Sequence, residues 1–173
     1  RRDNMLSYAR KLYDYLAEEV DITGTDHKDI FHITTTPDGI TTVEAWVKRK
    51  SKGDLLKYER TFYPNETKEI RIYGLRGNDD FKINGDENKA ITLRIIGGDG
   101  EDLVMDDTRG RKAKIYDNKY GIQLKGKSLV NKTSEDVNVN EYDRSSFTYN
   151  TSLPLATFGY TIDDGFWLGG SYS

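Results

Sequence analysis

Cysteine is absent from this chain of 173 residues, and proline occurs only three times. Without cysteine the chain has no disulfide framework, no cysteine nucleophile and no thiolate zinc site. The 26 basic and 29 acidic residues give a net charge of −3, so no positively charged surface for nucleic acid is expected. No apolar run approaches the roughly 18 residues of a membrane-spanning helix. One domain, or one domain with an appendage, is the expectation for this length.

The supply of hydrophobic residues is small and unusually aromatic. They make up 35% of the chain and include 12 Tyr, 6 Phe and 2 Trp. A chain of this length can bury a core, but here the core must be thin and must use aromatic side chains. This composition disfavours a helical bundle rich in Leu and Ala.

The first 20 residues predict an amphipathic helix. Asp3 or Asn4 is placed to cap its amino end. Apolar residues recur at spacings of four, three, four and four, at Met5, Ala9, Leu12, Leu16 and Val20. We expect this helix to dock on the rest of the chain through its apolar side. A helix that binds a partner is the alternative.

An antiparallel meander is predicted after the helix, with strands at 30–36, 40–48 and 56–63. Residues 37–39 supply the first turn and residues 51–54 the second, each with the residue types that tight turns require. The middle segment alternates apolar residues with polar or aromatic ones, as a half-exposed strand does. The whole stretch is rich in Thr, Val, Ile and aromatic residues, which favours strands.

A short strand motif then recurs along the chain. It occupies residues 69–74 and 92–97, which are 23 positions apart, and a third copy at 112–117 follows after 20 more, with an earlier echo at 20–24. Repeats near 20 residues are typical of parallel strands stacked in a solenoid or roll, where each turn buries its face against its neighbours. The predicted fold is mainly β, with an N-terminal amphipathic helix, an antiparallel meander and a short solenoid or β-roll-like stack of parallel strands.

Three parts of the chain are distinguished on this basis. Residues 1–20 form the helix, residues 21–143 a β-rich domain with glycine–aspartate turns, and residues 144–173 an extended tail. Aromatic and small residues alternate over 166–172. This alternation suits the first strand of a membrane barrel, an exposed hairpin or a packed terminal strand.

The turns after three of the strand copies share one pattern. Residues 97–105 match the nonapeptide G-G-x-G-x-D-x-U-x, where U is a large apolar residue, at each specified position. Residues 74–82 lack the second glycine, and residues 24–32 lack both inner glycines. Glycine permits positive φ, so backbone carbonyls can turn into the loop. Two such turns on adjacent coils would surround a hard cation such as Ca²⁺ with carbonyl and carboxylate oxygens.

These turns resemble the calcium-binding β-roll repeat of the RTX type. RTX rolls repeat in tandem every nine residues, whereas the copies here are 23 apart. The alternative is that the aspartates cap backbone amides and hold no metal. The resemblance implies Ca²⁺ as the cofactor and the following ligand residues: Gly74, Arg76, Asp79, Gly97, Asp99 and Asp102, with Asp29 on a neighbouring coil.

A wider resemblance covers most of the chain. It rests on the series D-I-T-G-T-D-x-x-D-I-F, Y-G-L-x-G-N-D-x-F and I-I-G-G-x-G-x-D, and on I-D-D-G-F-W-L-G-G at residues 162–170. This series is similar to the region between a calcineurin-like metallophosphoesterase module and an outer-membrane β-barrel in bacterial envelope proteins. The resemblance implies a location in the periplasm or outer membrane and partners within a larger envelope protein. Contact with the membrane would come only through a C-terminal barrel.

The phosphoesterase itself is not expected in this chain, because a two-metal centre needs several histidines and only His27 and His32 occur. We therefore predict a non-catalytic β-rich module that acts as a spacer or adaptor and is stabilised by calcium. Three alternatives stay open. The first is a carbohydrate- or ligand-binding module that uses Trp46, Trp167 or tyrosines. The second is an accessory part of a metallophosphoesterase, and the third is a hydrolase that uses the acids of 99–107.

Overall fold

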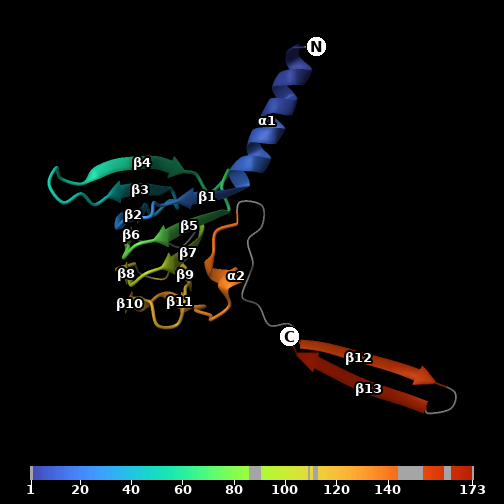
Figure 1. Ribbon diagram of the computed structural model, residues 1–173. Coiled ribbons are helices and arrows are strands. Elements are labelled where there is room, and N and C mark those ends of the chain that lie inside the picture. The colour runs from blue at the N-terminus through green and yellow to red at the C-terminus, as the bar shows by residue number, and fades with distance from the viewer. Residues whose placement is uncertain are drawn as a thin grey trace.

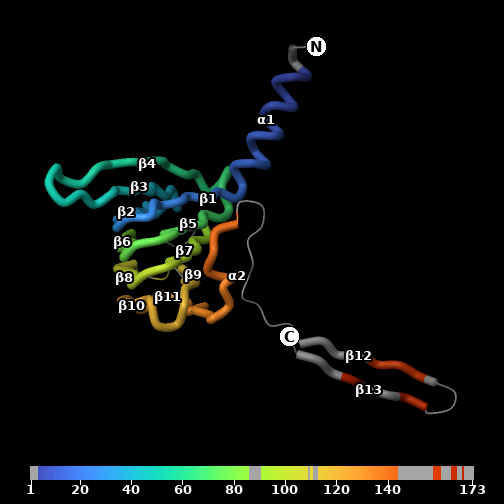
Figure 2. The backbone as a smooth tube through the Cα atoms, in the orientation of Figure 1, coloured from blue at the N-terminus to red at the C-terminus, as the bar shows by residue number. Residues whose placement is uncertain are grey.

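A computed structural model describes residues 2–85, 91–108, 110, 113–143, 154–161 and 165–172 (Figure 1). The described part is mainly β, with a long helix at its start, antiparallel strands in one sheet and stacked parallel strands. The predicted fold class is therefore confirmed. Figure 2 follows the chain as it passes back and forth between two sheets, from one coil to the next.

Helix α1 (Arg2–Glu18) projects from the body of the molecule (Figure 1). Near its carboxyl end Ala17 is buried, and further up the helix Arg10 and Tyr13 reach Glu66 at 3.4 and 3.5 Å. The large apolar side chains of the helix remain exposed. The expectation that the apolar side docks on the body is therefore wrong for the described residues, because the nearest sheet edge meets only the last turn.

Sheet A is the sheet of the solenoid in which all strands are parallel. Its strand order is β1 (Glu19–Thr23), β5 (Glu69–Arg76), β7 (Thr92–Asp99), β9 (Ala113–Tyr116) and β11 (Leu129–Asn131). Ile72 lies opposite Ile95, and Ile95 lies opposite Ile115. The repeated motif thus places its copies on neighbouring strands, as the intervals between them predict.

Sheet B faces sheet A across the core. Its strand order is β10 (Ile122–Gly126), β8 (Asp102–Asp106), β6 (Asp80–Gly85), β2 (Asp29–Thr35), β3 (Thr41–Val47) and β4 (Leu55–Phe62). The first four strands are parallel, and the last two continue the sheet, with β3 antiparallel to β2 and β4 antiparallel to β3. Strands β2, β3 and β4 are the predicted meander, with a register shift between Ala45 and Trp46.

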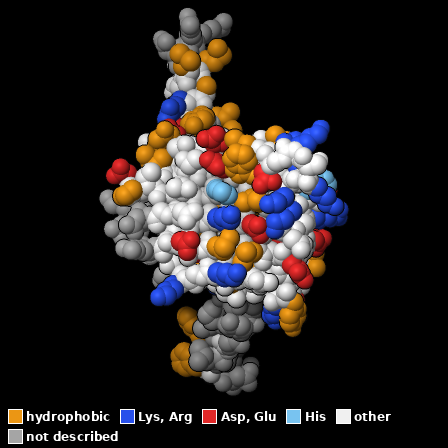
Figure 3. Space-filling view, turned by 90° about the vertical axis from the view of Figure 1, so that its left-hand side faces the viewer, with side chains coloured by type: hydrophobic (Ala, Val, Ile, Leu, Met, Phe, Trp, Pro, Cys, Tyr) orange, Lys and Arg blue, Asp and Glu red, His pale blue; other side chains and the backbone are white. Residues whose placement is uncertain are grey.

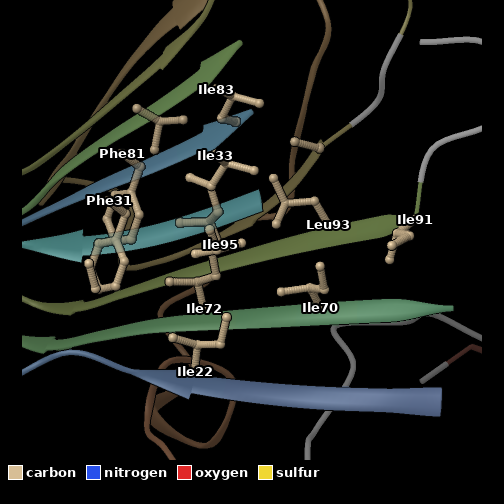
Figure 4. Close-up of a cluster of buried hydrophobic side chains, with 14 of the residues drawn as sticks. Ile22, Phe31, Ile33, Ile70, Ile72, Phe81, Ile83, Ile91, Leu93 and Ile95 are labelled. Carbon is tan, nitrogen blue, oxygen red and sulfur yellow. The ribbon is translucent and has the colours of Figure 1, made fainter. Parts of the chain in front are cut away.

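The hydrophobic core lies between the two sheets. Figure 4 shows Ile22, Ile72 and Ile95 on neighbouring strands of sheet A. In sheet B, Phe31 and Phe81 stack with their ring centroids 4.9 Å apart. Alternate residues of each strand point into this layer, so each coil covers the apolar face of the next.

The outer face of sheet A carries buried charges. Glu69 forms ion pairs with Arg71 at 2.7 Å and with Arg94 at 2.8 Å, and Arg94 also donates a hydrogen bond to the hydroxyl of Tyr116 at 2.6 Å. The two arginines occupy matching positions in the first two copies of the strand motif. Because a buried charge is costly without a partner, this network holds three adjacent strands together.

Helix α2 (Val137–Asn140) covers another part of this outer face. Asp136 caps its amino end, where the side chain accepts a hydrogen bond from the Asn138 N–H. The helix packs through Val139 on a small cluster of outward-facing side chains from three strands: Tyr73, Ile96 and Tyr116. The segment after β11 thus returns along sheet A and buries part of its outer surface.

Strands β12 (Pro154–Thr161) and β13 (Gly165–Tyr172) form an antiparallel two-stranded sheet. The tail expected to be extended therefore contains a hairpin. Its side chains Phe158 and Phe166 are exposed. That β13 begins a membrane barrel stays a prediction, and residues 144–153 lie outside the described part. Among the described residues, no helix has both the length and the apolar character needed to cross a membrane.

Candidate functional site

Turns from sheet A to sheet B lie above one another at one edge of the solenoid. Because β2, β6 and β8 are neighbours in the sheet, Asp29, Asp79 and Asp102 come together at this edge. Asp117 directly follows β9 and adds a carboxyl group from the next coil. We call these four residues the aspartate ladder. The prediction that Asp79 and Asp102 share one edge is confirmed.

Hydrogen bonds of the ladder run from coil to coil. The Asp29 N–H donates to Asp79 Oδ1 at 2.8 Å, and the Asp79 N–H donates to Asp102 Oδ1 at 2.8 Å. Asp29, on the first coil, accepts instead from the Thr25 N–H of its own turn at 2.5 Å. Each of these carboxyl groups therefore satisfies a buried backbone donor. This is the amide-capping arrangement that the sequence leaves open as the alternative to metal binding.

The first glycine of each turn is required for space. A Cβ atom on Gly74 would lie 2.4 Å from Asp79 Oδ2 and 2.3 Å from the Gly97 carbonyl oxygen. On Gly97 it would lie 2.1 Å from Asp117 Oδ2 and 2.4 Å from Asp102 Oδ2. These distances are far below ordinary van der Waals contact. The glycine and the aspartate five positions later are therefore one structural unit.

The inner glycine of the complete motif has a different role. Gly100 has a φ of 151°, and its Cβ position lies 1.6 Å from the Gly77 carbonyl oxygen of the coil beside it. Both the backbone conformation and the close approach of the two turns favour glycine here. The nonapeptide pattern thus encodes tightly stacked turns, whether or not a metal is bound.

Burial dominates the electrostatics of the ladder. Asp79 and Asp117 are fully buried and Asp102 is 2% exposed. Desolvation raises the pKa of Asp79 and that of Asp117 to about 8, and it also raises the pKa of Asp102 and of Asp29. The Oδ2 atoms of Asp79, Asp102 and Asp117 have no hydrogen-bond partner among the described residues. For Asp79 and Asp117 a protonated carboxyl group at neutral pH matches this environment.

Ca²⁺ fits the turns in donor chemistry but not in donor number. It takes about six to eight oxygen ligands, whereas two oxygens, Asp79 Oδ2 and the Gly97 carbonyl oxygen, meet between the second and third coils. Within the part of the chain that the structure describes, no three acidic or histidine side chains are grouped to hold a metal. Calcium binding therefore stays a prediction of the sequence resemblance.

The seven predicted ligand residues fall into three groups. Asp29, Asp79 and Asp102 belong to the ladder, and Gly74 and Gly97 lie directly beneath the aspartates.

The remaining two residues lie on the surface of the same turns. The side chains of Arg76 and Asp99 are 70% and 86% exposed, and the Arg76 Nε lies 3.8 Å from Asp99 Oδ2. They point away from the ladder. The resemblance implicates these two residues through their backbone carbonyls, so the direction of their side chains leaves that prediction untested.

Asp117 is the ladder residue that sequence reasoning missed. In the third strand copy it follows Tyr116, at the position where the first two copies have Gly74 and Gly97. A polar residue in place of a sterically required glycine was the available signal. Its carboxyl group extends into the space above Gly97, which has no side chain.

A cleft of about 490 Å³ opens beside these turns, next to α2. Its floor is apolar and includes Tyr73, Leu75 and Ile96, and its rim is largely acidic. The rim residues are Asp26, Arg76, Asp99, Asn118, Glu135 and Glu141. The cleft is therefore amphipathic, with an aromatic floor and more negative than positive side chains.

Comparisons of the chain with family models, curated proteins and solved structures gave no match. The class of protein is therefore defined by the fold and its turns alone. It is a short two-sheet parallel β-solenoid, with buried aspartates that link successive coils and an antiparallel meander on its first coil.

Proposed function

We propose that this chain is a non-catalytic spacer or adaptor within a larger bacterial envelope protein. The observation that carries the proposal is a stack of coils that follows an exposed apolar helix and precedes an exposed apolar hairpin in the chain. The five strands of sheet A span roughly 20 Å at the usual strand spacing. A rigid body of this kind keeps the modules on its two sides at a fixed separation.

The polar interior supports a structural role for the acidic residues. The ladder aspartates accept backbone hydrogen bonds, and the buried Glu69 pairs with two arginines. Acid–base catalysis requires carboxyl groups within reach of a substrate. The fully buried Asp79 and Asp117 do not meet this requirement.

The envelope location and the neighbouring modules come from the sequence resemblance. It implies a metallophosphoesterase module before this region and an outer-membrane module after it. In this proposal the solenoid separates the two, and α1 and the hairpin are the segments that connect to them. The accessory role in a metallophosphoesterase is then part of the spacer function, because the solenoid holds the enzyme module apart from the outer-membrane module.

A replacement experiment in the parent protein tests the spacer role. Residues 19–131 are exchanged either for an unrelated parallel β-solenoid of the same number of coils or for a flexible Gly/Ser linker of equal length. We expect the unrelated solenoid to preserve the growth phenotype and the amount of parent protein in the outer-membrane fraction, and the linker to impair both. Failure of the unrelated solenoid would show that the surface of this chain carries its own function. Recovery of the parent protein in the cytoplasm would overturn the envelope location.

The enzyme alternative has a separate test. The purified chain is assayed against phosphomonoester, phosphodiester and glycoside substrates, with Asp99→Ala and Asp107→Ala variants as controls. We expect no turnover by the wild-type chain. Turnover that either substitution abolishes would overturn the non-catalytic proposal.

Calcium stabilisation is tested by thermal unfolding with millimolar Ca²⁺ and with a chelator. A cation that binds only the folded state raises stability by RT ln(1 + [L]/Kd). Because only two oxygens, Asp79 Oδ2 and the Gly97 carbonyl oxygen, meet between the second and third coils, far fewer than the about six to eight that Ca²⁺ takes, we expect an unchanged Tm. A rise in Tm that the chelator reverses, and that Asp102→Asn removes, would establish the calcium site that the RTX resemblance implies.

The cleft favours ligand binding as a second candidate function. Tyr73 and Tyr142 line it and pack edge to face with ring centroids 4.6 Å apart. Of the two tryptophans predicted to stack on sugars, Trp46 is half-buried and donates to Glu44 at 2.9 Å, and the side chain of Trp167 lies outside the described part. A glycan array with the wild-type chain and Tyr142→Ala tests this function. Binding that depends on Tyr142 would support it.

A further inference from the structure

Helix α1 carries a large apolar surface that the rest of the described chain leaves uncovered, apart from the contact between the Tyr13 hydroxyl and Glu66. Figure 3 shows hydrophobic side chains along the helix, above a body whose visible face mixes both signs of charge. Each of the following α1 side chains is at least 45% exposed: Met5, Leu6, Tyr8, Leu12, Tyr13, Tyr15 and Leu16. Contiguous exposed surface of this size is typical of an interaction site rather than of scattered surface residues.

The apolar positions of α1 follow a heptad. Met5 and Leu12 take the d positions, and Ala9 and Leu16 take the a positions, with alternating spacings of four and three. The flanking e and g positions are apolar or aromatic as well: Leu6, Tyr8, Tyr13 and Tyr15. From residue 3 onward the charged residues occupy the opposite positions b, c and f, and Arg2, at the amino end of the helix, takes an a position. This is the distribution of a helix that packs on another helix.

We propose that α1 forms an antiparallel two-helix pair with α1 of a second copy of this chain. In this register Met5 packs on Leu16 of the second copy, and Ala9 packs on Leu12 of the second copy. The two-fold axis passes between residues 10 and 11, so each of these side-chain contacts occurs twice in the dimer. A small side chain meets a larger one in the central layers, which lets the helices approach closely.

The flanking aromatic residues match in the same register. Across an antiparallel seam, g positions face g positions and e positions face e positions. Tyr8 therefore meets Tyr15 of the second copy, and Leu6 meets Tyr13 of the second copy. One apolar face is thus complementary to itself, as a two-fold interface requires.

The available area agrees with a stable dimer. At about 150–250 Å² for a large aromatic side chain and somewhat less for an aliphatic one, the exposed fractions of α1 amount to on the order of 900 Å². A specific interface buries about 800 Å² on each partner. A lipid surface is a poorer match, since the polar side of a membrane-binding helix is rich in Lys and Arg. Here Asp3, Asp14 and Glu18 balance the basic residues.

The position of the body favours the antiparallel arrangement. The solenoid begins directly at the carboxyl end of α1. The 17-residue helix is about 25 Å long, so antiparallel pairing places the two bodies at opposite ends. A parallel pair would hold the helix axes about 8–10 Å apart with both bodies at the same end. Two six-stranded sheets do not fit side by side at that separation.

Sedimentation equilibrium of the full chain tests the pairing. We expect a concentration-dependent dimer and, because a lone helix of this length is marginal in water, helical circular dichroism that grows with concentration. The double variant Leu12→Glu/Leu16→Glu buries charge in the seam, so its dimer Kd should rise at least about 100-fold. The matched control Asn4→Glu/Ser7→Glu adds the same charge outside the seam and should dimerise as the wild type. Because unfolding of the whole chain could also remove the dimer, near-ultraviolet circular dichroism confirms that the solenoid of each variant is folded.

Disulfide crosslinking tests the register, since the chain has no native cysteine. Met5→Cys alone and Leu16→Cys alone should not crosslink on oxidation, whereas a mixture of the two should form the heterodimer. Crosslinking of Met5→Cys with itself would overturn the antiparallel arrangement. A monomer at all concentrations, or a dimer that Leu12→Glu/Leu16→Glu leaves intact, would overturn the pairing itself.

Discussion

Gly97 lies at the most crowded point of the aspartate ladder, and it is close to two carboxyl groups from different coils. A Cβ atom there would lie 2.1 Å from Asp117 Oδ2 and 2.4 Å from Asp102 Oδ2. We expect Gly97→Ala to lower the free energy of unfolding by about 3 kcal/mol, at the upper end of overpacking costs. Urea unfolding measures the change.

Gly53→Ala is the control for this substitution. Gly53 has a φ of 70° and nothing within 4 Å of its Cβ position. The alanine there suffers the backbone penalty alone, about 1–2 kcal/mol. An effect of Gly97→Ala no larger than that of Gly53→Ala would contradict the steric role of the ladder.

The raised pKa of Asp79 makes stability depend on pH. Its pKa is raised to about 8 in the folded state, largely by burial, from an ordinary value of 3.8. Between these values the folded state binds a proton that the unfolded state has released. The contribution of Asp79 to stability is therefore greatest below about pH 4 and is lost as pH rises toward 8. The slope is at most about 1.4 kcal/mol per pH unit for one such group.

Asp79→Asn tests this dependence. The amide keeps the Oδ1 acceptor for the Asp29 N–H and replaces the protonated oxygen by a permanent donor. We expect unfolding free energies between pH 5 and 8 to fall less steeply in this variant than in the wild type. Asp107→Asn, at an exposed position, should leave the slope unchanged. Equal slopes for Asp79→Asn and the wild type would show that Asp79 is ionised throughout.

The elements of this fold differ in how much of them local sequence determines. Strands β2, β3 and β4 agree with the predicted segments to within about two residues, because turn residues and alternation mark them. The recurring strand motif predicted the parallel stacking of β5, β7 and β9, because equivalent strands of a solenoid have equivalent neighbours and therefore similar sequences. The exposure of α1 was not predictable, because an amphipathic pattern shows which face is apolar and not what covers it.

The predictability of the candidate site has the same limit. The G-x-x-x-x-D spacing located Asp79 and Asp102, since the glycine and the aspartate contact each other within one turn. Asp117 belongs to a turn without that spacing and reaches the ladder only through its contact with the neighbouring coil. Contacts between coils are long-range in sequence. A pattern within one turn therefore does not report them.

Glu69 tests whether the outer charge network stabilises sheet A as an element. It pairs with arginines of two adjacent strands, and its side chain is 10% exposed. Glu69→Gln removes the charge that Arg71 and Arg94 share. Because Arg71 keeps its ion pairs with Glu19 at 2.6 Å and Asp21 at 3.6 Å, we expect a cost of about 1–3 kcal/mol of unfolding free energy. Glu59→Gln, at an exposed position of β4, should change stability by less than about 0.5 kcal/mol. Similar effects of the two substitutions would show that the network adds nothing.

At the scale of the whole molecule, stability is a sum over neighbouring coils. Each strand of sheet A contacts only the strands beside it, so an inner coil has two neighbours and an outer coil has one. The inner strands β5 and β7 also carry the largest number of fully buried side chains, among them Ile72 and Ile95. The free energy of local opening should therefore be highest in the middle of the stack.

Hydrogen exchange followed by mass spectrometry measures this gradient. We expect the amides of β5 and β7 to exchange most slowly and those of β10 and β11 faster, since the last coil has no neighbour on its outer side among the described residues. Gly97→Ala should speed exchange in β7 and β9, whose turns it separates, more than in β1. Equal protection across all coils would mean that the stack opens as one cooperative unit. A spacer must resist load from both ends, so a slowly exchanging centre is also the behaviour that the proposed function requires.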